Sequence, residues 1–205
     1  MTEAWAAFEA RLAAMAEDGT VCGRRIVPGE GCRLQPPVCL IGEAPGGQEE
    51  AQGRPFVGKA GQNLNEFLDA VGLRREDIWI TNVVKVRPSR VSPKGTISNR
   101  PPNRMELKLF LPLLHEELAL VRPRLAVTLG NTALQALLGP EALIGACHGR
   151  LTRCSLLGGP ELPLFPLYHP ASIIYNPALK AVYAADLGLL REALDRLENE
   201  NAVCS

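Results

Sequence analysis

Two carboxylates lie on a glycine-rich loop of this sequence, where they could act as a general base or stabilise a cation. The run Gly-Glu-Ala-Pro-Gly-Gly at 42–47 contains Glu43, and Glu49 follows shortly after it. The apolar stretch 38–41 before this run predicts a buried parallel strand, and α/β proteins bind ligands at the carboxyl edge of a parallel sheet. The loop has neither the lysine ending of a phosphate-binding loop nor the spacing of a dinucleotide fingerprint, so it does not indicate a nucleotide site.

A second glycine-bounded run, 53–58, carries an aromatic residue, Phe56, in otherwise small and polar surroundings. A planar ligand could stack on this ring, but phenylalanine is equally common as a plain core residue. The sequence leaves both interpretations of Phe56 open.

An amide and an imidazole also accompany predicted strands. Asn82 lies inside the apolar run 78–84, where an amide is costly unless it is hydrogen-bonded. It either closes a turn or recognises a ligand that offers both a donor and an acceptor, as the edge of a nucleobase does. His169 follows the apolar stretch 164–168, and Pro170 favours an extended backbone at this histidine. We therefore expect both side chains at the sheet edge that carries the glycine-rich loops.

The hydrophobic pattern predicts strands that alternate with helices. Strands are expected at 38–41, 78–84, 125–129 and 164–168, and helices at 2–17, 61–71, 103–120, 131–138 and 179–199. This alternation is typical of an α/β fold, here three αβα layers around a central four-stranded, mainly parallel sheet. The 205 residues are expected to form a single domain, 1–205, with its core at about 29–190. The connection 88–102 is longer than most and is either functional or mobile.

Charge is balanced over the whole chain but not along it. The formal net charge is zero, yet the segment 85–108 holds seven basic residues against one acid. This stripe either meets a phosphate backbone or is a solvated loop followed by an ordinary helix face. The sequence has no apolar run of membrane-spanning length and no C-x-x-C pair among its six cysteines, so we expect a cytoplasmic protein with free thiols and no metal site.

Five motifs in order resemble those of the family 4 uracil-DNA glycosylases. They are Gly-Glu-Ala-Pro-Gly from 42, Gly-Arg-Pro-Phe-Val-Gly-Lys-Ala-Gly from 53, Thr-Asn-Val-Val-Lys from 81, Asn-Arg-Pro from 99 and His-Pro-Ala from 169. The similarity covers roughly residues 29–190 and implies the same layered fold. It also implies an enzyme that flips uracil out of DNA and hydrolyses its N-glycosidic bond, leaving an abasic site.

The resemblance implies roles for the residues of the predicted sheet edge. Phe56 would stack on the extruded uracil, and Asn82 would hydrogen-bond its pyrimidine edge beside the loop that contains Gly42 and Ala44. His169 would donate toward the uracil O2 as negative charge develops there.

The two carboxylates match positions implicated in the chemistry. Glu43 and Glu49 would orient the attacking water or stabilise positive charge on the sugar, in an order that the sequence leaves open.

The resemblance also implies a DNA-contacting surface. Residues 172–175 would enter the minor groove and wedge the base stack open. The extra residues 91–98 leave the register of Asn99 open, with Asn103 as its substitute. The expected DNA-binding residues are Lys85, Arg87, Asn99, Arg100, Ser172, Ile173, Ile174 and Tyr175.

One feature of the family is missing from this sequence. Many members carry a 4Fe-4S cluster on four cysteines, but the matching positions fall near Ala14, near Glu17, at Val86 and near Leu109 or Phe110. Because such a cluster needs cysteine thiolates, we expect no cluster and no other cofactor, with apolar packing by Val86 and Phe110 in its place. Three cysteines that the sequence does contain, Cys22, Cys32 and Cys39, do not have the spacing of a known cluster pattern.

The expected partners are DNA that contains uracil and the enzymes that process abasic sites downstream in base excision repair. We expect a monomer that associates with the nucleoid through DNA. Two alternatives stay open: a glycosylase for another deaminated base, hypoxanthine or xanthine, and a non-catalytic DNA-binding or polymerase-associated module of the same fold.

Overall fold

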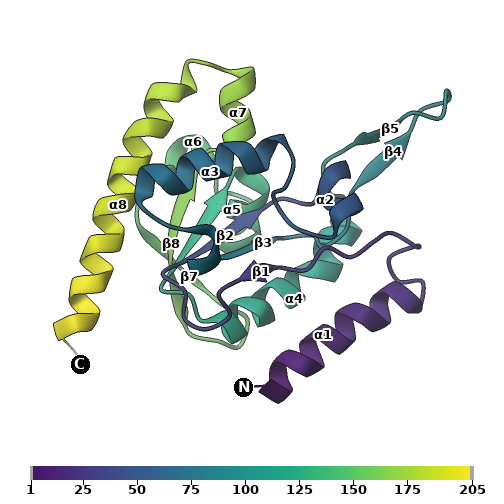
Figure 1. Ribbon diagram of the computed structural model, residues 1–205, viewed down its shortest axis with the longest axis horizontal. Coiled ribbons are helices and arrows are strands. Elements are labelled where there is room, and N and C mark those ends of the chain that lie inside the picture. The colour runs from purple at the N-terminus through teal and green to yellow at the C-terminus, as the bar shows by residue number, and fades with distance from the viewer. Residues whose placement is uncertain (1, 204–205) are drawn as a thin grey trace.

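The computed structural model describes residues 2–203 as helices packed around one main sheet (Figure 1). The side chains of residues 2, 59, 60, 63, 174, 175 and 200–203 lie outside the described part, as do residues 1, 204 and 205. Cys204, one of the expected free thiols, is therefore not described, whereas the five described cysteines form no disulfide. Within the described residues, no helix is both long and apolar enough to cross a membrane.

The main sheet has six strands in the order β1-β3-β2-β6-β8-β7. Its four central strands are parallel, whereas each edge strand is antiparallel to its neighbour. The expected α/β fold with a mainly parallel sheet is confirmed, and the expected number of strands is corrected from four to six. The strands are β1 (Glu30–Gly31), β2 (Val38–Gly42), β3 (Trp79–Asn82), β6 (Leu125–Leu129), β7 (Thr152–Ser155) and β8 (Glu161–Leu167).

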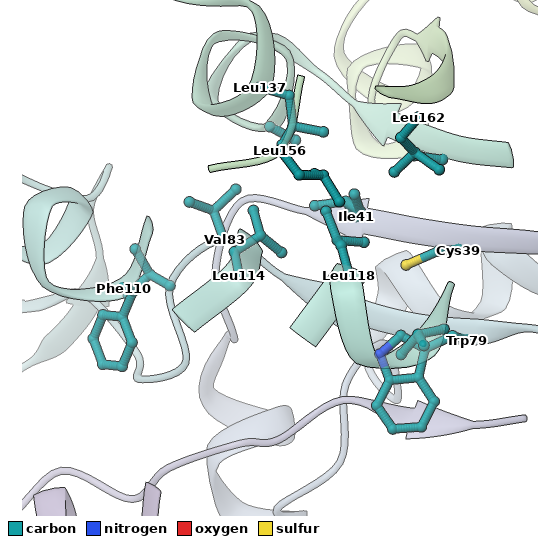
Figure 2. Close-up of a cluster of buried hydrophobic side chains, with 14 of the residues drawn as sticks. Cys39, Ile41, Trp79, Val83, Phe110, Leu114, Leu118, Leu137, Leu156 and Leu162 are labelled. Carbon is teal, nitrogen blue, oxygen red and sulfur yellow. The ribbon is translucent and has the colours of Figure 1, made fainter. Parts of the chain in front are cut away.

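Helices cover both faces of this sheet because its central strands are apolar on both faces. In β2, Cys39 and Ile41 belong to one buried cluster, whereas Val38 and Leu40 belong to the other. The first cluster is completed by α1 (Thr2–Glu17), α4 (Arg104–Val121) and α5 (Asn131–Leu138), and the second by α3 (Lys59–Val71) and α8 (Leu179–Val203). Figure 2 shows the first cluster, in which Ile41 and Leu118 meet between sheet and helix.

The expected helices are all present, but several short elements were not predicted. They are α2 (Gly47–Gln52), a 3-10 turn η1 (Arg75–Asp77), α6 (Ile144–Cys147) and α7 (Pro170–Tyr175). Each is too short to show a helical hydrophobic period in the sequence. The long connection 88–102 contains a hairpin of β4 (Ser89–Val91) and β5 (Ile97–Asn99), which forms a sheet of its own and projects from the body of the molecule (Figure 1).

A fully buried ion pair joins the end of β3 to the middle of α4. The Lys85 ammonium donates to Glu117 Oε2 at 2.5 Å, to Thr81 Oγ1 at 2.5 Å and to the backbone oxygen of Asn82 at 2.8 Å. Glu117 also accepts from Trp79 Nε1 at 3.1 Å and from the Thr81 hydroxyl. All three ammonium protons and both carboxylate oxygens therefore have partners, which is the condition under which a buried ion pair is tolerated.

Glu117→Gln should destabilise the fold by about 3–5 kcal/mol, because it leaves the Lys85 ammonium buried without its counter-ion. Lys85→Met should have a similar cost, whereas the double variant Lys85→Met/Glu117→Gln should lose clearly less than the sum of the two. Urea unfolding of the four proteins measures these differences. A cost below about 1 kcal/mol for either single variant, the level of an exposed pair, would contradict the assignment.

Candidate active site

The carboxyl ends of the parallel strands meet at one edge of the sheet. Gly42 at the end of β2 is the register partner of Asn82 at the end of β3, and Leu129 of β6 pairs with Leu167 of β8. A cleft of about 400 Å³ opens at this edge. It is lined by Ala44, Gly46, Gly47, Gln48, Glu49, Phe56, Gly58, Asn82, Asn99, His169 and Ala171. The structure therefore brings Glu49, Phe56, Asn82, Asn99 and His169 together, as the sequence predicts.

The Asn82 amide lies on the floor of the cleft and is available to a ligand. Its residue is only 4% exposed, yet its side chain has no hydrogen-bond partner among the described residues. A Cβ on Gly42 would lie 2.4 Å from Asn82 Oδ1 and 2.5 Å from Phe56 Cζ, so only glycine fits between the two side chains. Its oxygen and nitrogen are therefore available to pair with a donor and an acceptor of a ligand in the cleft.

Phe56 lies against the same floor on a strained backbone. Its φ of 51° is left-handed, which costs a residue with a Cβ roughly 1–2 kcal/mol. Arg75 holds this turn by donating to the Pro55 oxygen at 2.6 Å and to the Phe56 oxygen at 3.2 Å, while Glu30 pairs with the same guanidinium. The sequence did not single out Arg75, because nothing in the chain marks a residue 19 positions away as its brace.

Glu49 joins the two glycine-rich loops. Its carboxylate accepts from the backbone N–H of Gly46 at 3.1 Å, of Val57 at 3.1 Å and of Gly58 at 2.8 Å. The residue is 8% exposed, so these donors would have little access to water without it. Glu49 therefore holds the loop that carries Phe56 against the loop that begins at Gly42.

Glu43 has a different environment. Its carboxylate is half-buried and accepts one hydrogen bond, from the Thr132 hydroxyl at the start of α5, at 2.5 Å. Its other oxygen has no partner among the described side chains and backbone groups. Thr132 was not predicted as a site residue, because it lies 89 positions from Glu43.

His169 caps the short helix α7. Its Nδ1 accepts from the backbone N–H of Ala171 at 3.1 Å, so in the neutral ring the proton is on Nε2. Burial lowers the pKa of His169 below its usual value, which keeps the ring neutral at neutral pH. The His169 and Phe56 ring centroids are 6.4 Å apart and their planes differ by 22°. The geometry presents an N–H donor within reach of a planar ligand stacked on Phe56.

The structure decides between the two candidate asparagines of the Asn-Arg-Pro segment. Asn99 lies at the end of β5 and lines the cleft, where it accepts from Arg87 Nε at 2.8 Å. Asn103 caps α4 and accepts from the Glu106 N–H at 2.9 Å, while Glu106 reaches back to the Asn103 N–H. Asn99 is therefore the cleft residue and Asn103 is structural.

Three of the expected DNA-binding cations have internal partners. Lys85 is corrected: its side chain is fully buried in the pair with Glu117 and cannot reach a phosphate. Arg87 pairs with Glu50 at 3.2 Å, and Arg100 forms two hydrogen bonds to Glu106. The Arg100 guanidinium, the Arg24 guanidinium and the Asn103 N–H lower the pKa of Glu106 to about 2. Arg87 and Arg100 thus fix the base of the projecting hairpin.

The predicted wedge segment 172–175 is part of α7. Ser172 and Ile173 are half-buried, and Ile173 packs against the second buried cluster, so its side chain does not stand out as a wedge in this conformation. The side chains of Ile174 and Tyr175 lie outside the described part of the structure.

The positions matched to the cluster cysteines do not fit an iron-sulfur cluster. Val86 and Phe110 are fully buried among the apolar side chains of the first cluster, and Phe110 is visible there in Figure 2. Ala14 and Glu17 of α1 are exposed. Among the described residues, no group of three or more His, Cys, Asp or Glu side chains could hold a metal ion. Apolar packing thus occupies two of the four matched positions, and none of the four carries the thiolate that a cluster needs.

Comparisons with known proteins agree with this geometry. The family model described as "Uracil DNA glycosylase superfamily" matches residues 28–193. The chain is 39% identical over 170 residues to a type-4 uracil-DNA glycosylase of Pyrobaculum aerophilum, covering 81% of this chain and 82% of that protein. It is 36% identical to type-4 uracil-DNA glycosylases of Saccharolobus solfataricus, covering 83% of this chain and 77% of that protein, and of Thermotoga maritima, covering 74% and 72%.

Glu49→Ala should destabilise the fold by at least about 2 kcal/mol, because three backbone donors lose their acceptor in a nearly buried place. Glu43→Ala should cost about 1 kcal/mol or less, since only one hydroxyl loses a partner. Thermal and urea unfolding of both variants measure the difference. Equal losses of stability in the two variants would contradict the inference that Glu49 joins the two loops.

Proposed function

The chain belongs to the uracil DNA glycosylase superfamily, and from that membership we propose that it removes uracil from DNA by hydrolysing its N-glycosidic bond. It is a DNA repair enzyme that leaves an abasic site. The observation that carries the proposal is the unpartnered, nearly buried Asn82 amide in the cleft, which lies beside the Phe56 ring with Gly42 between the two side chains. We take the whole chain to act as one glycosylase domain.

Base recognition follows from the cleft floor. Uracil presents acceptors at O2 and O4 and a donor at N3, and one carboxamide can pair with a neighbouring donor and acceptor at once. Asn82 supplies this pair, and the Phe56 ring supplies a stacking surface. Ala44 lines the cleft beside them, and Gly42 packs behind Asn82 and Phe56. A base inside the duplex cannot reach this floor, so the nucleotide must first be flipped out, which costs a few kcal/mol of unstacking.

His169 stabilises the departing base. As the glycosidic bond breaks, the bonding electrons leave with the base and negative charge develops on its O2. The neutral imidazole donates its Nε2 proton in a hydrogen bond toward that oxygen. The Ala171 N–H holds Nδ1 as the acceptor, which keeps the donor directed away from α7.

The two carboxylates take different roles in this proposal. Glu49 is a positioning residue, because both of its oxygens are occupied by backbone N–H groups of the two loops. Glu43 does not line the cleft itself, but it keeps one oxygen without an internal partner and directly precedes the cleft-lining Ala44. We assign to Glu43 the orientation of the attacking water or the stabilisation of the cationic sugar.

We further propose that the enzyme works without an iron-sulfur cluster. The support is the absence of cysteine at all four matching positions and the fully buried apolar packing of two of them, Val86 and Phe110. No step of the mechanism above uses a cofactor. We also propose that the enzyme is a cytoplasmic monomer and that downstream repair enzymes process its abasic product. In the complex with DNA, Asn99 and α7 lie next to the DNA.

Asn82→Ala and His169→Ala should each lower the single-turnover rate of uracil excision by about 10²–10³-fold, the usual cost of removing one well-placed hydrogen-bonding group. The substrates are labelled oligonucleotides with one uracil opposite guanine, opposite adenine or unpaired, and alkaline cleavage reports the abasic product. Asn82→Ala should unfold like the wild type, because its amide has no internal partner to lose among the described residues.

Asn199→Ala is the matched control, since this exposed asparagine of α8 lies far from the cleft residues in sequence and should leave the rate unchanged. Wild-type rates in Asn82→Ala would overturn the recognition role. Wild-type protein that excises hypoxanthine or xanthine but not uracil would indicate a glycosylase for another base. Absence of excision from every substrate would indicate a binding module.

Protein purified from iron-replete cells should contain iron far below one atom per chain and show no broad absorbance in the visible blue. The reason is that the matching positions carry Val86 and Phe110 in place of thiolates. Metal analysis and absorption spectroscopy measure this directly. Stoichiometric iron with acid-labile sulfide would contradict the cofactor-free proposal.

A further inference from the structure

The hairpin of β4 and β5 is a rigid arm at the mouth of the cleft. Its two strands pair with each other, with Ser89 opposite Asn99 and Val91 opposite Ile97. Arg100 anchors the base by donating from its backbone N–H to the Pro88 oxygen and from Nε to the Ser89 oxygen, both at 3.1 Å. The arm therefore starts from fixed contacts, and its far end projects away from the body (Figure 1).

One face of this arm continues the lining of the cleft. Side chains alternate between the two faces of a hairpin, so Val91 and Ile97 lie on the same face as Asn99, which lines the cleft. Val91 is 68% exposed and Ile97 is 56% exposed, and they are directly opposite each other. An apolar cross-strand pair thus sits next to the cleft mouth with nothing of the described chain covering it.

The charge of the arm points to the chemistry of its partner. The segment 88–102 contains no acidic residue. Arg90 and Lys94 are exposed, and neither has an acidic partner among the described residues. The Arg90 side chain donates only to the Ser98 hydroxyl within that part of the chain. Arg87 and Arg100 at the base of the arm are paired with Glu50 and Glu106. An exposed, unpaired positive charge beside an apolar pair suits a polyanion that also presents apolar sugar and base surfaces.

We infer that the β4–β5 hairpin is a DNA-contacting arm that lies along nucleotides flanking the flipped uracil, with Val91 and Ile97 against the neighbouring sugar or base and Arg90 and Lys94 on phosphates. The inference rests on the proposed function, because it takes the cleft to hold a nucleotide of DNA. From Asn99 to Lys94 the arm spans five residues, or roughly 16 Å of extended strand. With a rise of about 3.4 Å per nucleotide, it reaches roughly four to five nucleotides on one side of the uracil.

The decisive variant removes the arm and keeps its base. Replacing residues 91–97 by the dipeptide Asn-Gly leaves Arg90 opposite Ser98 across a two-residue turn, which is a favoured hairpin connection. Binding is measured on duplexes that carry a non-cleavable abasic analogue, with flanks of ten nucleotides or with one flank trimmed to a single nucleotide. We expect the variant to lose about 10-fold in affinity on the long duplex and to match the wild type when the contacted flank is trimmed.

Point variants separate the two parts of the arm and leave the core untouched. Arg90→Ala/Lys94→Ala should reduce the slope of log Kd against log salt by roughly 2, about 0.9 for each phosphate contact. Val91→Ser/Ile97→Ser should weaken binding with an unchanged slope. The matched charge control is Arg124→Ala/Arg153→Ala, which removes two exposed arginines near the amino ends of parallel strands, at the opposite sheet edge, and should not change the slope.

Equal binding of the shortened protein and the wild type to the long duplex would overturn the proposal that the hairpin contacts DNA. So would a loss that is independent of flank length, because that would indicate a structural role. The proposed function is tested separately by wild-type excision of uracil from the trimmed substrate, which the arm does not reach. Failure of that reaction would count against the function and not against the arm.

Discussion

The buried pair of Lys85 and Glu117 connects the elements on which the cleft depends. It fixes the end of β3 through the Asn82 carbonyl and the Thr81 hydroxyl, and it fixes α4 through the carboxylate. Two charges taken out of water are costly, so the pair is tolerated only because every donor and acceptor is satisfied. The pair holds the Asn82 backbone in one position, and from there the Asn82 side chain reaches the cleft.

The same helix α4 organises the other side of the cleft mouth. Its first turn is closed by Asn103 and Glu106, and Glu106 also binds Arg100 at the base of the hairpin. The helix thus holds the strand end that carries the Asn82 amide and, at its start, the base of the hairpin that borders the cleft. Opposite it, Glu49 and Arg75 hold the strained Phe56 turn by its backbone groups. Apart from Glu49, which lines the cleft, the charged groups that hold the cleft residues in place lie outside the cleft lining.

The sequence predicts the helices and central strands well, because these elements carry long apolar runs with a clear period. It also places Phe56, Asn82 and His169 at one edge, since parallel strands end on the same side. It fails where the outcome depends on a distant partner. Lys85 resembles a surface cation in a basic stripe, and only the position of Glu117, 32 residues later, buries it. Thr132 and Arg75 were missed for the same reason.

The segment that follows Lys85 contains one of the four positions matched to the family's cluster cysteines and also the extra residues of the hairpin. Val86 stands at a position matched to a cluster cysteine, and the extra residues of the hairpin begin only a few residues later. A cluster ligated in this segment would tie it to α1 and α4 through metal bonds. Here Val86 is held by apolar packing, and the Arg100 to Glu106 bonds fix the chain after the hairpin. Because these contacts anchor the segment on both sides, a hairpin can extend from it without loosening the cleft floor.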